Sequence, residues 1–240
     1  MVRSDDGSFT AYSKEYNEHY HSTKDGALKE SLLKHVKPAL EIKKTQNEIK
    51  ILDICFGLGL NTLTTLWYYD THKLGNKLKI YSPEFDVELI DSLVHFRYPN
   101  EFTKYLPIIQ ALVEDGVYED EYFFIELFRG DARGYIKKFA DFFDVVYQDA
   151  FSPAVNPVLW TQEYFADIAK AIKDDGVLTT YSTALKTRLA LHYNGFEVYL
   201  NTGDGFRNAT VASLIPLKTF QKVDMEHKIT CNPDMEPLRD

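Results

Sequence analysis

An acidic residue and an aromatic ring follow one of the most apolar stretches of the chain. Residues 142–147 are almost wholly apolar, and Asp149, Phe151 and Pro153 come soon after them. A carboxylate held at the end of a buried strand can orient an N–H group, while a nearby ring packs on a base or a cation. A primary alkylamine, with a pKa on the order of 10, must lose a proton before it attacks an electrophile. Asp149 is therefore the candidate that prepares an amine acceptor.

A glycine-bearing turn follows an earlier apolar strand. Residues 49–55 are predicted to form a buried strand, Gly57 and Gly59 a tight turn, and residues 61–69 a helix. Glycines allow left-handed dihedrals and close approach of a ligand, which the positive end of the helix would attract. The same short pattern also occurs in turns that are purely structural.

Glu84 favours the ligand-binding interpretation. It ends the next predicted strand, about 25 positions beyond the glycines, where an acidic side chain can hold ribose hydroxyls. The turn lacks the full G-x-G-x-x-G pattern, because Cys55 stands near the first glycine position and Thr62 near the last. This departure favours S-adenosylmethionine over NAD as the ligand.

Asp131 has two competing interpretations. It opens a predicted helix after an apolar strand, so it is either an N-cap or an acceptor for an adenine amino group. Asp53, Glu84, Asp131 and Asp149 all stand at or near strand ends. Ligands of open α/β sheets bind beyond the carboxyl ends of the strands, so these four acids are predicted to face one crevice.

The elements that must position these residues alternate between strands and helices. The apolar patterns predict the following order: strand 49–55, helix 61–69, strand 78–84, helix 87–95, a helical region 101–121, strand 122–128, helix 132–139, strand 143–149, helix 161–172, strand 176–182, helix 184–193, and strands 196–201 and 210–216. This alternation predicts an α/β fold, with a mostly parallel open sheet and an antiparallel C-terminal edge hairpin.

An extension precedes this alternation. Residues 1–22 are expected to form short strands or an ordered arm, and residues 27–40 a helix whose apolar face carries Leu28, Leu32, Leu33 and Val36. The predicted division is an N-terminal arm and helix at 1–48, an S-adenosylmethionine-dependent domain at 49–220 and a tail at 221–240.

Bulk properties fit a cytoplasmic globular protein without a structural metal. The chain of 240 residues has two cysteines, Cys55 and Cys231, and its seven histidines show no metal-ligand spacing. No apolar run approaches the roughly 20 residues that a membrane crossing requires. The oligomeric state stays open.

The net charge of −9 is the observation least favourable to a nucleic-acid partner. Basic residues nevertheless cluster, for example at Lys34, His35 and Lys37, and the ordinary interpretation of such a group is the solvated face of a helix. For a nucleic-acid substrate, basic residues are expected to gather on the rim near Asp149.

Three motifs resemble the MnmC/MnmD-type tRNA methyltransferases. They are D-I-C-F-G-L-G-L-N at 53–61, Q-D-A-F-S-P-A-V-N-P-V-L-W-T at 148–161 and G-F-R at 205–207. The resemblance implies a class I, Rossmann-like methyltransferase fold with S-adenosylmethionine as the donor. It implies that the acceptor is the primary amine of 5-aminomethyl(-2-thio)uridine at the wobble position of tRNA, so that tRNA is the expected partner.

The resemblance also implies roles for single residues. The expected cofactor-binding residues are Tyr20, Ser22, Glu30, Phe56, Gly57, Gly59, Asn61, Glu84 and Asp131. Of these, Tyr20, Ser22 and Glu30 are expected to close over the cofactor from the N-terminal segment. Asp149 and Phe151 are expected to meet the acceptor nucleoside, with Pro153, Asn156 and Arg207 as further substrate-binding residues.

Bifunctional members of the family also carry a C-terminal FAD-dependent oxidase, and the sequence shows no second dinucleotide motif. We therefore expect no FAD and activity on the aminomethyl form alone. Three alternatives stay open: an aminopropyltransferase of the spermidine synthase type, a small-amine N-methyltransferase, and a non-enzymatic tRNA-binding scaffold.

Overall fold

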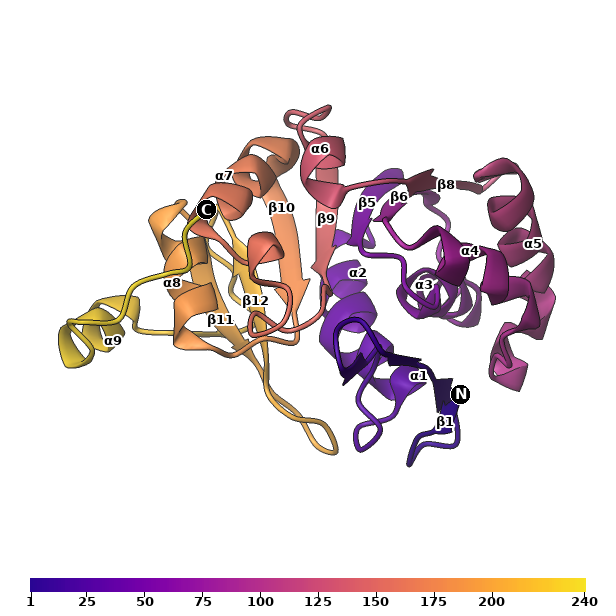
Figure 1. Ribbon diagram of the computed structural model, residues 1–240. Coiled ribbons are helices and arrows are strands. Elements are labelled where there is room, and N and C mark those ends of the chain that lie inside the picture. Colours follow the sequence, from indigo (N-terminus) through magenta and orange to yellow (C-terminus); the bar gives the residue numbers. More distant parts are fainter.

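One mixed sheet of nine strands forms the middle of the molecule. In the computed structural model, which describes residues 1–240, its strands are β5 (Glu48–Ile54), β6 (Lys77–Glu84), β7 (Val117–Glu119), β8 (Phe123–Arg129), β9 (Phe143–Gln148), β10 (Ile172–Thr180), β11 (Glu197–Asn201), β12 (Ala209–Ser213) and β13 (Gln221–Lys222). Their order across the sheet is β13-β11-β12-β10-β9-β5-β6-β8-β7. Figure 1 shows the long central strands running side by side.

The central strands are parallel and the edges antiparallel. β10, β9, β5, β6 and β8 pair in parallel, whereas β12, β11 and β13 on one side and β7 on the other pair antiparallel. The predicted α/β class, the mostly parallel sheet and the C-terminal hairpin are thus confirmed. The two-residue strand β13 adds one further strand outside that hairpin.

Helices cover both faces of the sheet. They are α1 (Ala27–Glu30), a π-helical segment (Ser31–Val36), α2 (Lys37–Lys43), α3 (Leu60–Thr71), α4 (Val87–Ser92), α5 (Leu106–Asp115), α6 (Ala132–Ile136), α7 (Gln162–Ala171), α8 (Leu185–Tyr193) and α9 (Met225–Cys231). Short 3-10 turns lie at Leu93–His95, Asn100–Tyr105 and Pro157–Leu159.

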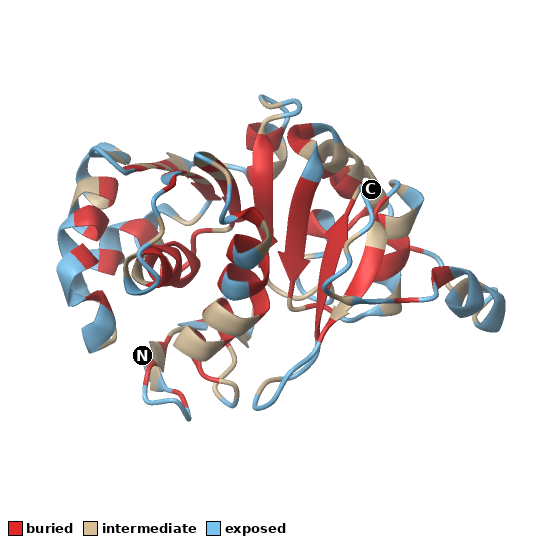
Figure 2. Ribbon diagram, turned by 180° about the vertical axis from the view of Figure 1, so that it is seen from behind, coloured by how far each residue is buried: buried red, intermediate tan, exposed pale blue.

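The side chains of β5 explain why helices cover both faces of the sheet. Ile49 and Ile51 point into the core shared with α2, α3 and α5, while Leu52 and Ile54 point into the core shared with α6, α7 and α8. Successive side chains of a strand face opposite sides, so a run of apolar residues at both parities must be covered on both faces. Figure 2 shows these central strands as almost continuously buried.

The N-terminal segment is an ordered arm, as predicted. It contains β1 (Val2–Arg3), paired with β2 (Phe9–Thr10), and β3 (Tyr12–Ser13), paired with β4 (Glu18–His19). The chain then continues as helix from Ala27 to Lys43, slightly beyond the predicted end. In Figure 1 the arm lies below the sheet, beside the turn that joins β11 to β12.

Two expectations need correction or detail. The helical region predicted for 101–121 ends at Asp115, and residues 117–119 form the edge strand β7, whose outward side chains gave no strand pattern. The tail folds back on the main fold: Leu238 forms a bridge to Thr161, and Asp240 accepts a hydrogen bond from that threonine. The division at 48 and 220 stays a prediction.

No helix combines the length and apolar character that a membrane crossing requires.

Candidate active site

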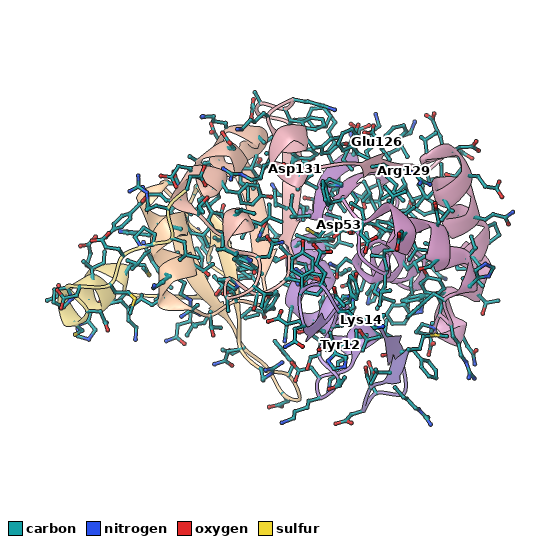
Figure 3. All side chains as sticks on the ribbon, viewed as in Figure 1. Tyr12, Lys14, Asp53, Glu126, Arg129 and Asp131 are labelled. Carbon is teal, nitrogen blue, oxygen red and sulfur yellow. The ribbon has the colours of Figure 1, made fainter.

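A cavity of about 1190 Å³ lies beyond the carboxyl ends of β5, β6 and β9. Its walls are the loops that follow these strands, the arm residues 15–24 and the turn that carries Arg207. A drug-sized ligand site typically has a volume of roughly 300–1,000 Å³, so this cavity has room for more than one ligand group. Figure 3 places Asp53 in the interior, between Asp131 above and the arm residues Tyr12 and Lys14 below.

The turn after β5 is built from left-handed residues. Cys55, Gly57 and Gly59 have φ values of 64°, 54° and 71°. A Cβ on Gly59 would lie 2.8 Å from the ring of Phe56, so any other residue at this position would be strained. Cys55 adopts the left-handed dihedral where other loops of this kind have glycine, and burial raises the pKa of its thiol. Cys55, Phe56, Gly57 and Asn61 line the cavity, whereas Gly59 lies behind it.

Glu84 joins the ends of β5 and β6. One carboxylate oxygen accepts a hydrogen bond from the backbone N–H of Gly57 at 2.8 Å, and the other from that of Asp86 at 2.9 Å. Burial raises the pKa of Glu84 above its ordinary value. Each oxygen keeps a second lone pair, so the carboxylate can still accept hydroxyl groups of a ligand in the cavity.

Asp131 is an N-cap. Its side chain accepts a hydrogen bond from the backbone N–H of Arg133 at 2.8 Å and starts α6. The residue is exposed and also lines the cavity. The capping interpretation is confirmed, and a contact with adenine stays a prediction.

Asn61 lies between two carboxylates. Its side-chain amide donates to Asp149 Oδ2 at 2.8 Å and contacts Asp53 Oδ1 at 3.3 Å. Asp53 is fully buried beneath the cavity, where Thr62 Oγ1 donates to its other oxygen at 2.9 Å. Burial and the nearby charge of Asp149 raise the pKa of Asp53 to about 7 despite these hydrogen bonds. Of the four strand-end acids, three line the cavity and Asp53 supports it from below.

Asp149 is kept ionised although it is buried. Burial pushes its pKa upward, but His35 and the amide of Asn61 outweigh that effect, so the pKa lies below its ordinary value. His35 Nε2 is 3.3 Å from Asp149 Oδ1. Asn61 and His35 approach the two carboxylate oxygens from inside the protein. The side of the carboxylate that lines the cavity is therefore open to a ligand.

Phe151 is covered by the arm. Its ring stacks on Tyr16 with centroids 4.5 Å apart and an interplanar angle of 20°, and Tyr20 packs at 4.9 Å. Glu18 accepts hydrogen bonds from the backbone N–H and the hydroxyl of Ser152. The arm is therefore attached directly to the loop that carries Asp149.

The long motif at 148–161 has a structural basis. The indole Nε1 of Trp160 donates to the carbonyl of Phe151 at 2.7 Å, and Gln148 Nε2 donates to the carbonyl of Leu159 at 2.8 Å. From β10, the hydroxyl of Tyr181 donates to the carbonyl of Ala150 at 2.9 Å. These bonds fix the backbone around Phe151. Asn156 lines the cavity, whereas Pro153 does not.

Ser22 and Glu30, which were predicted to close over the cofactor, line the cavity and bind one another, and the hydroxyl of Ser22 also accepts a hydrogen bond from Arg207 at 3.1 Å. Glu30 accepts from the backbone N–H of Ser22 at 2.6 Å and from Lys34 Nζ at 2.7 Å. Lys34 and Arg207 also share Asp25, at 2.7 and 3.1 Å. Arg207 is thus engaged within the chain, and contact with tRNA stays a prediction for it.

The cavity lining is acidic, so the expected basic rim is wrong for these residues. Eight carboxylates line it, against three cations. The cations are Lys24, Lys34 and Arg207, of which the last two are already paired. An acidic lining suits ligands with a positive charge, such as a sulfonium ion or an alkylammonium ion. Phosphate groups would have to lie outside it.

The helix at 27–43 buries a polar face, which the sequence interpretation missed. Glu30, Ser31, Lys34 and His35 are buried, whereas Leu28, Leu32 and Leu33 are only half-buried. The solvated-face interpretation is wrong for Lys34 and His35, because this face borders the cavity. The one signal of this buried polar face in the sequence was the run of consecutive polar residues between Leu28 and Leu32. No group of three or more His, Cys, Asp or Glu side chains is arranged to hold a metal ion.

Comparison with known proteins narrows the class. Residues 96–214 match a family described as S-adenosyl-L-methionine-dependent methyltransferases. An uncharacterized protein of Methanocaldococcus jannaschii is 34% identical over 202 residues, which cover 82% of this chain and 54% of that protein. The tRNA 5-methylaminomethyl-2-thiouridine biosynthesis bifunctional protein MnmC of Azoarcus sp. is 33% identical over 212 residues, covering 82% of this chain and 32% of that protein.

A solved structure agrees over the whole chain. The crystal structure of MNMC2 from Aquifex aeolicus superposes with a TM-score of 0.83 at 32% identity, covering 100% of this chain and 78% of that one. A spermidine synthase, at 20% identity and a TM-score of 0.51, shares the fold.

The family match and the similarity to MNMC2, together with the glycine turn after β5 and the acid that ends β6, identify an S-adenosyl-L-methionine-dependent methyltransferase. Within that class, the chain belongs to the MnmC methyltransferase family, as the motifs at 53–61 and 148–161 had indicated.

Proposed function

We propose that this protein methylates the primary amine of 5-aminomethyl(-2-thio)uridine at the wobble position of tRNA, with S-adenosylmethionine as the donor. One observation carries the proposal: Asn61, which closes the glycine turn, donates directly to Asp149, which begins the acceptor loop. A donor held by the turn and an amine held by Asp149 would therefore lie next to each other in one acidic cavity.

The residues after β5 and β6 fit a donor with this chemistry. Asn61 Oδ1 is buried and has no hydrogen-bond partner, so an amino group of the donor would satisfy it. Glu84 can accept ribose hydroxyls, and Gly57 and Phe56 line the same side of the cavity. S-adenosylmethionine, once bound, supplies an electrophilic methyl group on a positively charged sulfur.

Asp149 would act on the acceptor. As a carboxylate it attracts the alkylammonium ion and accepts one proton from it, which frees the nitrogen lone pair to form the new N–C bond. The C–S bond of the donor would break as the N–C bond forms, its electron pair staying on the sulfur as a neutral thioether, and the proton would pass from Asp149 to solvent. Phe151 would pack on the uracil ring after Tyr16 moves aside. The remaining acceleration comes from proximity and orientation.

The test uses methyl-labelled S-adenosylmethionine and tRNA from cells that lack this modification. After digestion, we expect the label in 5-methylaminomethyluridine or its 2-thio form, and no label with the Asp149→Ala variant. Unlabelled tRNA, despite measured binding of the donor, would refute the proposal.

The acidic lining favours one second candidate, a small-amine N-methyltransferase. In a parallel assay the tRNA is replaced by simple diamines and polyamines. Labelled amine without labelled tRNA would support this candidate. Transfer from decarboxylated S-adenosylmethionine would instead indicate an aminopropyltransferase.

A further inference from the structure

Behind Asp149 lies a buried histidine that the proposed chemistry does not yet use. We propose that His35 is a positioning residue for the methyl transfer: its Nε2–H holds Asp149 in the orientation that meets the acceptor amine. This role deepens the proposed function and rests on it. His35 touches neither ligand, so it would act only through Asp149.

The geometry of the contact supports this role. His35 is 0% exposed, and its Nε2 is 3.3 Å from Asp149 Oδ1. Nε2 is buried without a hydrogen bond of normal geometry, and Asp149 Oδ1 is the carboxylate oxygen within reach of it; on the opposite oxygen Asn61 donates at 2.8 Å. The carboxylate therefore has one nitrogen near each oxygen: a formed hydrogen bond from Asn61 and a longer contact with His35. Hydrogen bonds of this kind are often long in ligand-free sites and tighten when substrate binds.

Thr179 is placed where it can favour the tautomer that the proposal requires. Its hydroxyl lies 3.2 Å from His35 Nδ1, on the far side of the ring from Asp149. When this hydroxyl donates to Nδ1, the proton of the neutral imidazole is on Nε2 and points at the carboxylate. Tyr147 packs edge-on against the ring at 5.8 Å and keeps its plane fixed.

The backbone explains how a helix brings a histidine to this place. His35 lies in the π-helical segment, within a run of three consecutive buried residues, Lys34, His35 and Val36. A regular α-helix buries residues three or four apart. The wider π turn enlarges the buried face, and such turns are frequent at functional sites.

Other charged groups also influence Asp149. The groups that face it, besides His35, are Asp53 on β5, Cys55 in the glycine turn, His21 in the arm and Tyr181 at the end of β10. His35 is thus one of two histidines that favour the ionised form of Asp149, and the one in close contact. Its removal leaves burial as the dominant influence, which raises the pKa of Asp149.

The experiment compares His35→Leu, which removes the donor, with His35→Gln, whose amide nitrogen can replace Nε2. We expect His35→Leu to lower kcat on the order of 10²-fold, as a displaced group does, with the affinity for S-adenosylmethionine unchanged. The acidic limb of the pH profile of kcat/KM should move to higher pH. His35→Gln should recover most of the activity, and Thr179→Val should fall between the two.

The exposed His227, on the outlying helix α9, gives a matched control, because His227→Leu should retain full activity. A folded His35→Leu enzyme with the wild-type kcat and pH profile would overturn the proposal. So would a folded His35→Gln that is as impaired as His35→Leu.

A second readout separates this inference from the proposed function. The side-chain carboxyl carbon of Asp149 can be titrated by NMR in the ligand-free protein, with and without His35. A higher apparent pKa in His35→Leu supports the contact even if tRNA proves not to be the substrate. An unchanged titration would refute the contact even if tRNA is methylated.

Discussion

The floor of the cavity is held by backbone and by buried side chains, whereas its roof is held by pairs of side chains near the surface. We call the floor residues 55–61, 84 and 149–151, and the roof residues 15–25 and 205–208. In the floor, the Asp149 side chain is 8% exposed and contacts Asn61 and His35. In the roof, the Arg207 side chain is 69% exposed and holds Asp25 through a rim ion pair.

This difference suggests that the floor carries out the reaction and that the roof controls how the substrate enters. Floor groups are fixed at the ends of the central strands, as a reaction that depends on alignment requires. The exposed contacts of Arg207 with the arm each contribute little, so the turn at 205–208 can part from the arm when a large substrate enters. Changes in the floor should therefore alter rate and stability strongly, and changes in the roof should alter mainly substrate entry.

The largest effect is expected for Asp149→Asn, which keeps the shape of the floor and removes its charge. Because the amide cannot accept a proton, kcat/KM for tRNA should fall on the order of 10³-fold. Methyl transfer from labelled S-adenosylmethionine measures this, and Asp115→Asn, an exposed acid at the end of α5, should leave it unchanged. A loss below tenfold would show that Asp149 does not carry the chemistry.

Asp53→Asn should change how stability depends on pH. The pKa of Asp53 is raised from 3.8 to about 7 in the folded protein, so the folded state binds the extra proton. The contribution of Asp53 is therefore greatest below about pH 4 and is lost as pH rises towards 7, by up to about 4 kcal/mol. Relative to wild type, the variant should gain stability between pH 5 and 8 in urea denaturation. A constant difference across that range would contradict the shifted pKa.

Gly59→Ala should destabilise the floor by about 1–3 kcal/mol, because its left-handed φ is unfavourable for alanine and the new Cβ meets Phe56. Gly134, inside α6, has open space around it and no left-handed φ, so Gly134→Ala should be neutral or stabilising by up to about 1 kcal/mol. Thermal and urea denaturation of the two variants measure the contrast. Equal effects would mean that the turn is not strained.

The smallest effect is expected in the roof. Arg207→Ala removes an exposed ion pair with Asp25, so the free energy of unfolding should change by less than about 1 kcal/mol. We expect a higher KM for tRNA with kcat retained, and the stability change should vanish in 1 M salt. A large fall in kcat would place Arg207 with the floor residues and break the distinction.

The floor was largely predictable from the sequence because buried strands and glycine turns leave local patterns. The apolar runs before Cys55 and Asp149 predict strands, and the strand-end positions of Glu84 and Asp149 follow from them. Strand β7 was missed because a short edge strand with exposed side chains has no such pattern. The binding roles of the cavity residues stay predictions.

The roof and the supporting histidine could not be predicted in the same way. The contact between His35 and Asp149, and that between Arg207 and Asp25, join residues far apart in the sequence. Their helix and turn gave no local sign of a partner. The buried face of the helix at 27–43 was likewise misassigned, because apolar periodicity marks leucines as core even where the neighbouring surface is a polar cavity.

The stack of Tyr16 on Phe151 has a consequence for the energetics of recognition. With centroids 4.5 Å apart, the two rings leave no gap for a third, so a uracil ring can stack on this face of Phe151 only by replacing Tyr16. Entry of the substrate is then an exchange of one aromatic neighbour for another, and the stacking energy nearly cancels. Selectivity must then come from the contact between the substrate amine and Asp149. Until an acceptor binds, Tyr16 shields the ring of Phe151 from water.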